Sequence, residues 1–126
     1  MRTRVSSGSP LEPVFGFCRA IRIGDRIVVG GTAAIEPDGS STPGGAAAQM
    51  ERCCAIAAQA ILDLGGHIDD AIQTRVFITS VGISAEVMAV HKKWFGGAMP
   101  VTAVIVVAGF VRPEWEVEIE VEAVFT

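Results

Sequence analysis

Four glutamates alternate with apolar residues in one short segment of this chain. They stand at positions 116, 118, 120 and 122, with Val117, Ile119, Val121 and Ala123 between and after them. Alternate side chains of a β-strand share a face, so the pattern predicts a strand with one acidic and one apolar face. A carboxylate in a partly desolvated groove has a raised pKa and can transfer protons, whereas a carboxylate in water is only a solvated surface group. The pattern alone leaves both interpretations open.

Other residue types that carry out catalysis are sparse. The two histidines, His67 and His91, lack the spacing of a metal site, so neither a metal nor a cofactor is expected. Cys18, Cys53 and Cys54 form neither a CxxC pair nor a disulfide framework, and we interpret them as buried apolar residues of a cytoplasmic protein. The paired glycines fit strand ends and helix ends better than a phosphate-binding loop.

Composition limits the classes of protein that fit. The 126 residues predict a single domain, 1–126, and the net charge of −4 argues against a nucleic-acid partner. A mean hydropathy of +0.46 is high for a small domain and is typical of a chain that buries apolar surface against another subunit. The most apolar stretch, 96–111, is interrupted by Pro100, so no membrane association is expected.

Hydrophobic periodicity predicts the elements that position these residues. The segment 6–13 reads as an irregular lead-in. The predicted elements are a β-hairpin over 17–30 with its turn at Gly24-Asp25, a helix over Gln49–Leu64, a strand over 73–79, a helix over 84–95 capped by Ser84, and strands over 101–108 and 117–124. This order predicts an α+β fold in which one mixed sheet carries both helices on one face.

The segment 101–108 would be apolar on both faces of a strand. That composition is typical of a central strand that is covered on both sides. Two helices cover only one face of a sheet, so we expect the other face to be buried by a second copy of the chain.

Four segments, taken in order, resemble the RidA family, which is also called YjgF or endoribonuclease L-PSP. They are VVGGTA (28–33), TRVFIT (74–79), PVTAVIVVAG (100–109) and VEIEVEAV (117–124). The resemblance covers nearly the whole chain. It implies a chorismate-mutase-like fold with a six-stranded mixed sheet, and a homotrimer that binds small molecules in clefts between its subunits. The best-known activity of the family is hydrolysis of reactive enamines and imines, such as 2-aminoacrylate.

The resemblance also implies roles for particular residues. Glu118 corresponds to the glutamate that positions the attacking water, while Gly31 and Phe17 correspond to substrate-binding positions. Deaminating members carry an arginine two residues after the proline, where it binds the substrate carboxylate, but this chain has Thr102. Threonine cannot form the bidentate pair of an arginine, so activity on 2-aminoacrylate does not carry over. The chain resembles an arginine-lacking subgroup.

The expected substrate-binding set consists of Phe17, Gly31 and Thr102 together with two residues of the loop that precedes the acidic strand. Arg112 is the candidate replacement for the missing arginine, and Trp115 is a candidate pocket wall. Two functions therefore stay open, a hydrolase or deaminase of imines or enamines, and a trimer that binds a small metabolite without turnover. RNA cleavage, which the older family name suggests, is disfavoured by the acidic composition.

Overall fold

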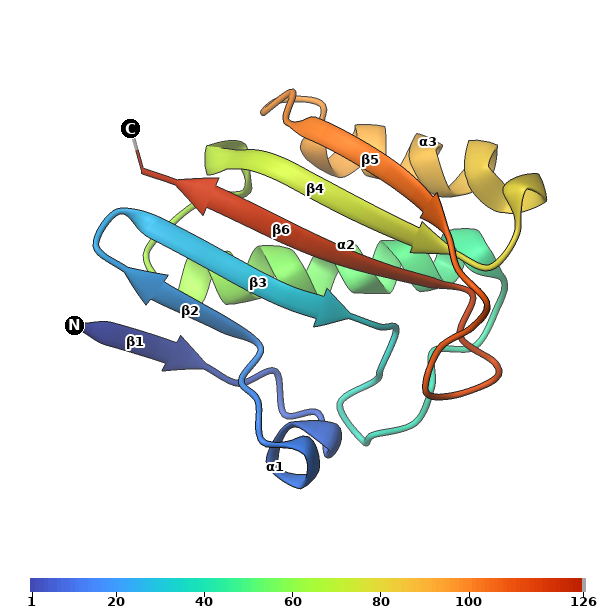
Figure 1. The fold of residues 1–126 in the computed structure, drawn as a ribbon, viewed down its shortest axis with the longest axis horizontal. Coiled ribbons are helices and arrows are strands. Elements are labelled where there is room, and N and C mark those ends of the chain that lie inside the picture. Colours follow the sequence, from blue (N-terminus) through green and yellow to red (C-terminus); the bar gives the residue numbers. More distant parts are fainter. Residues whose placement is uncertain (126) are drawn as a thin grey trace.

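The computed structural model describes residues 1–125, which form one six-stranded sheet and three α-helices (Figure 1). The elements are β1 (Arg2–Val5), α1 (Leu11–Phe15), β2 (Ala20–Ile23), β3 (Arg26–Thr32), α2 (Ala46–Asp63), β4 (Ala71–Ile78), α3 (Ser84–Phe95), β5 (Val101–Val106) and β6 (Val117–Val124), with 3-10 turns η1 (Ile68–Asp70) and η2 (Val81–Ile83). The strand order is β1-β2-β3-β6-β4-β5. Only the β4–β5 pair is parallel within this described range, so the predicted mixed six-stranded sheet is confirmed.

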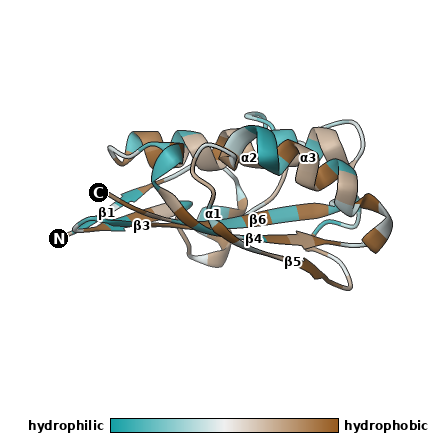
Figure 2. Cartoon of the chain, turned by 90° about the horizontal axis from the view of Figure 1, so that it is seen from above, coloured by the Kyte–Doolittle hydropathy of each residue, from teal (hydrophilic) through white to brown (hydrophobic). Residues whose placement is uncertain are grey.

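The two long helices lie on the same face of the sheet, as the element order predicted (Figure 2). α2 begins at Ala46, three residues before the predicted start, and ends before Gly65, whose φ of 90° is left-handed backbone that glycine adopts without strain. None of the helices within residues 1–125 combines the length and the apolar character needed to cross a lipid bilayer.

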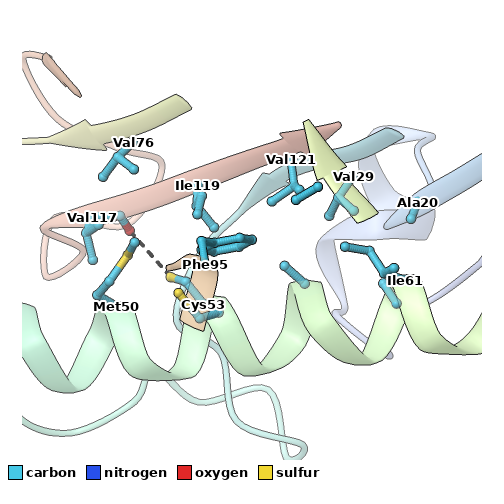
Figure 3. Packing of buried hydrophobic residues seen from close by; sticks show 14 of the residues in the cluster. Ala20, Val29, Met50, Cys53, Ile61, Val76, Phe95, Val117, Ile119 and Val121 are labelled. Atoms are coloured by element: carbon cyan, nitrogen blue, oxygen red, sulfur yellow. Dashed lines mark hydrogen bonds between the residues drawn. The ribbon is translucent and has the colours of Figure 1, made fainter. Parts of the chain in front are cut away.

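The core lies between α2 and the apolar face of β6. Val117, Ile119 and Val121 point toward Met50 and the neighbouring apolar residues of the helix (Figure 3). The alternation of β6 is therefore confirmed, since its apolar residues are buried while its glutamates lie on the opposite face. The cysteines, all of them within the described range, are free thiols.

The prediction that 101–108 is a central strand is wrong for the single chain. β5 is an edge strand, it ends at Val106, and all six of its residues are exposed. Its apolar composition thus has no counterpart within the fold of one chain, where an edge strand would ordinarily carry polar side chains.

The start of the chain is also more ordered than its composition suggested. Residues 2–5 form β1, which pairs with β2, and α1 occupies part of the segment expected to be an irregular lead-in. Ser84 does not cap α3 as predicted. It is the first residue of the helix, and its hydroxyl donates to the Val81 carbonyl at 2.7 Å.

The burial of two isoleucines in the sheet predicts that their truncation will lower the free energy of unfolding by different amounts. Ile119→Ala removes a side chain that is 0% exposed and should lower the free energy of unfolding by about 2–5 kcal/mol. Ile72→Ala is the matched control, because Ile72 of β4 is 45% exposed and its loss should cost less than about 1 kcal/mol. Chemical denaturation of both variants measures the difference, and equal losses would contradict the core described above.

Candidate functional site

The glutamates of β6 differ in the residues that face them across the sheet. Glu122 pairs with Arg26 of β3, and Glu120 pairs with Arg75 of β4, each with an N···O distance of 2.8 Å. Glu118 lies opposite Phe77 in the β4–β6 register. Phenylalanine offers no charge, so the strand register itself leaves this carboxylate without the cross-strand arginine that its neighbours have.

Glu118 makes no ion pair or side-chain hydrogen bond to any other residue in the range 1–125. Burial raises the pKa of its carboxyl group above the ordinary value of 4.5, and the nearby Glu120 adds to this. The charge of Arg19 acts in the opposite direction and only partly offsets the effect of burial. A carboxylate with these properties is a candidate proton acceptor. Of the two interpretations of the acidic face, proton transfer is therefore favoured over a solvated surface group at Glu118.

A cavity of about 130 Å³ lies beside Glu118. Its walls come from the segment around α1, the start of β2, the end of β3, α2 and the loop before β6. Four of the six predicted site residues line it, namely Phe17, Gly31, Trp115 and Glu118. Most of the remaining lining residues are apolar, so a carboxylate here meets little water.

Arg19 is the cation that lines this cavity. Only 5% of the residue is exposed, and its Nη1 donates to the Gly31 carbonyl and, at 3.1 Å, to the Thr32 hydroxyl. Its Nε lies 3.8 Å from Glu12, which α1 supplies, and has no hydrogen-bond partner in the described part of the chain. The guanidinium therefore joins α1 to the end of β3.

Glu12 is buried and holds the segment before β2 in place. Its Oε2 accepts hydrogen bonds from the backbone N–H of Ser7 at 3.1 Å and from the Ser7 hydroxyl at 2.6 Å. Burial alone would raise the pKa of Glu12, but hydrogen bonds from Ser7 and Ser6 and the charge of Arg19 lower it below the ordinary value. Glu12 is thus an ionised partner for Arg19.

Gly31 lies in direct contact with the candidate carboxylate. A Cβ atom at this position would stand 3.0 Å from Oε1 of Glu118, closer than ordinary van der Waals contact. A larger residue here would require the Glu118 side chain to shift by a few tenths of an ångström, so glycine favours its observed position.

Trp115 forms a cavity wall and is 3% exposed. Its Nε1 donates to the Ser41 hydroxyl at 3.1 Å, and the guanidinium of Arg112 lies 5.1 Å from its ring. Arg112 itself does not line the cavity. Its Nη1 donates to the Gly39 carbonyl at 3.0 Å and to Ser41 at 3.1 Å, so it supports Trp115 from the loop side.

Thr102 is separated from these residues within one chain. It pairs in register with Thr74 of β4, and the two hydroxyls are 2.7 Å apart. The Thr74 hydroxyl also contacts Nε2 of His91, at 2.8 Å, in α3. Thr102 therefore points to the helix face of the sheet, whereas Glu118 lies on the opposite face.

The sequence analysis predicted Arg112 as the replacement cation, whereas the arginine that lines the cavity is Arg19. One signal favoured Arg19, because it stands two residues after Phe17 and side chains two apart share a face in extended backbone. The contribution of Ser7, Ser9 and Phe15 gave no such signal, since it depends on how α1 folds back over β3.

The described residues hold no cluster of three or more His, Cys, Asp or Glu side chains arranged to bind a metal ion. What the cavity offers is one desolvated carboxylate, an arginine already bound to backbone and to Glu12, and apolar and aromatic walls. Such a site can accept a proton from water or from an N–H group of a small molecule.

Comparisons with known proteins agree on one family. A family model described as Endoribonuclease L-PSP matches residues 8–125. The uncharacterized protein SCO2049 of Streptomyces coelicolor is 39% identical over 120 residues, which cover 95% of this chain and 90% of that protein.

Solved structures give the same result. Rv2704 of Mycobacterium tuberculosis, described as a member of the YjgF/YER057c/UK114 family, is 35% identical with a TM-score of 0.89 and covers 99% of this chain and 100% of its own. The YjgF gene product of E. coli superimposes with a TM-score of 0.87 over 98% of each chain, and at 21% identity this likeness shows the fold alone.

Two adjacent glycines test the contact at Glu118. Gly31→Ala should move the carboxylate, because its Cβ would lie 3.0 Å from Oε1, and should change the carboxyl ¹³C chemical shift and apparent pKa of Glu118. Gly30→Ala is the matched control, since its Cβ would lie 3.7 Å from the Arg19 carbonyl, an ordinary contact. NMR titration of both variants checks this. An unchanged Glu118 signal in Gly31→Ala would show that the contact does not position the carboxylate.

Proposed function

The chain belongs to the Endoribonuclease L-PSP family, which includes the YjgF and RidA proteins, and on that premise we propose that it is a trimeric hydrolase of small imines or enamines with Glu118 as its base. The observation that carries the proposal is the carboxylate of Glu118, which is partly buried, has a raised pKa and makes no ion pair or side-chain hydrogen bond within residues 1–125, beside a cavity lined by Phe17, Gly31 and Trp115. The family resemblance supports the same roles for Glu118, Gly31 and Phe17.

The proposed reaction converts a protonated imine and water into a carbonyl compound and ammonium. Water oxygen adds to the imine carbon, the C=N π electrons move to nitrogen, and Glu118 accepts the proton that the water loses. Glu118 then returns this proton to nitrogen. The C–N bond breaks as the C=O bond forms, and ammonia leaves with the hydroxyl proton as ammonium. An enamine enters the same route after protonation at carbon.

Self-association is supported by the surface of β5. Its exposed residues include Val101, Val104, Ile105 and Val106, and as an edge strand it also has unpaired backbone groups. An apolar edge of this kind favours burial against another copy of the chain. In the proposed trimer the clefts lie between subunits, so Thr102 would lie at the rim of a neighbouring subunit's cavity, whereas Arg112 supports Trp115 from the loop side.

Binding without turnover is the second candidate function. It is favoured by the position of Thr102, whose hydroxyl bonds to Thr74 and gives no cation in place of the arginine that deaminating members carry. A cavity with one carboxylate can hold a metabolite without activating water. Purified protein that binds a ligand but releases no carbonyl product would support this function over hydrolysis.

RNA cleavage is not part of the proposal, although the family description names a ribonuclease. The net charge of −4 and the acidic face of β6 would repel phosphates.

The free cysteines fit a cytoplasmic protein, where thiols stay reduced.

The central test replaces the proposed base. Glu118→Gln should lower the rate of imine hydrolysis by about 10²–10⁴-fold, the usual contribution of a positioned acid or base. Glu122→Gln, on the same face and paired with Arg26, is the matched control and should retain the wild-type rate. Ammonia and carbonyl product are measured from an imine generated in the assay. Equal rates for Glu118→Gln and wild type would reject hydrolysis by this residue.

The raised pKa of Glu118 gives the reaction a pH dependence. A base must be ionised, so kcat/KM should increase with pH as Glu118 loses its proton, with the inflection above the ordinary value of 4.5. Initial rates across an acidic to neutral pH series measure this. In Glu118→Gln the residual kcat/KM should not show this increase with pH. If the increase is still present in that variant, another group is responsible for the titration.

Charge placed on the exposed edge strand should prevent trimer formation. Ile105→Asp puts a carboxylate on the face of β5 that the helices do not cover, and should shift the species in sedimentation equilibrium from three chains to one. Val81→Asp is the matched control, because Val81 is exposed in η2, away from the sheet edge. A wild-type protein that sediments as a single folded chain would remove the trimer from the proposal.

A further inference from the structure

The charges around the cavity divide into paired and unpaired groups, and this division bears on the ligand. Arg19 lies 3.8 Å from Glu12 and donates to the Gly31 carbonyl and the Thr32 hydroxyl. Its Nε is fully buried, and its Nη2 makes no hydrogen bond within residues 1–125. The charge of this one cation is already balanced by the buried Glu12, so the addition of Glu118 leaves the surroundings of the cavity with a net negative charge.

Arg112 does not supply the missing cation either. Its guanidinium is held against the Trp115 ring and donates to the Gly39 carbonyl and the Ser41 hydroxyl. Ser41 in turn donates to Glu114 at 2.7 Å, so an acidic group stands beside this arginine too. Arg112 therefore acts on the outer side of the Trp115 wall.

Glu118 is the charged residue of the cavity wall that makes no ion pair or side-chain hydrogen bond within residues 1–125. A ligand carboxylate in the same cavity would lie near a like charge in apolar surroundings, which is strongly unfavourable. A basic nitrogen would instead form a charge-assisted hydrogen bond with Glu118 and would neutralise it.

The walls favour the same ligand. Phe15, Phe17 and Trp115 place aromatic rings around the cavity, and Phe15 is 59% exposed, so apolar surface is available there. Aromatic faces attract cations as well as apolar groups. A small molecule with an aromatic or aliphatic body and a positively charged nitrogen therefore matches both the walls and the unpaired carboxylate.

We propose that this cavity selects apolar amines and protonated imines that carry no carboxylate group, with the ligand nitrogen paired to Glu118. The inference rests on the proposed function and names its substrate class. It gives the arginine-lacking site a specificity of its own, since the substrates become the imines of simple amines rather than those of amino acids. The reactions that would supply these substrates are those that form imines from carbonyl compounds without an acid group.

The test compares three probes of similar size and different charge. Benzylamine is a cation at neutral pH, benzyl alcohol is neutral, and benzoate is an anion. Isothermal titration or ligand-observed NMR at pH 7 should rank benzylamine first and benzoate last, with at least a tenfold difference between the two dissociation constants. In Glu118→Gln the three constants should converge, because the charge that separates them is gone.

Glu122→Gln is the matched control and should keep the benzylamine preference, since its arginine partner already neutralises Glu122. Thermal unfolding of both variants establishes that they are folded. Benzoate binding as tightly as benzylamine would overturn the proposal, as would an amine preference that survives Glu118→Gln or the absence of binding by all three probes.

A parallel hydrolysis assay separates this inference from the proposed function. Glu118-dependent hydrolysis together with equal binding of benzoate and benzylamine would reject the ligand class and keep the hydrolase. Selective benzylamine binding without hydrolysis of N-unsubstituted benzaldehyde imine would keep the ligand class and reject the hydrolase.

Discussion

The pairing of β4 with β6 is the constraint on which the candidate site depends. Its register places Arg75 opposite Glu120 and Phe77 opposite Glu118, so a two-residue step along the strand separates a neutralised surface carboxylate from a desolvated one. A shift of the register by one residue would move the whole set of glutamates to the helix side. The buried residues Ile119 and Val121 prevent that shift, and the hydrophobic core thereby fixes the electrostatics of the opposite face.

Around that carboxylate the chain builds a wall from distant parts of the sequence. Glu12 of α1 lies beside Arg19, and Arg19 donates to the carbonyl of Gly31, whose lack of a side chain leaves space for Glu118. The arginine serves mainly to hold these segments together.

The sequence predicted the parts of the fold that depend on periodicity. The alternation over 117–124 and the helical spacing from Met50 to Ile61 both lead to a buried face, and both elements are where they were expected. β5 was misplaced because apolar residues on both faces look the same whether the chain or a partner covers them. The candidate site was predicted in part. Four of its residues line one cavity, but the role of Arg19 depends on a tertiary contact with Glu12 that no local pattern encodes.

The position of β6 within the sheet has a consequence for how the protein is made. It is the last of the described strands to leave the ribosome, yet it joins β1, β2 and β3 on one side to β4 and β5 on the other. The two halves of the sheet cannot be joined until this strand has been synthesised. The sheet is then completed only after β6 has been synthesised, and the carboxylate of Glu118 arrives in the same step that closes the sheet.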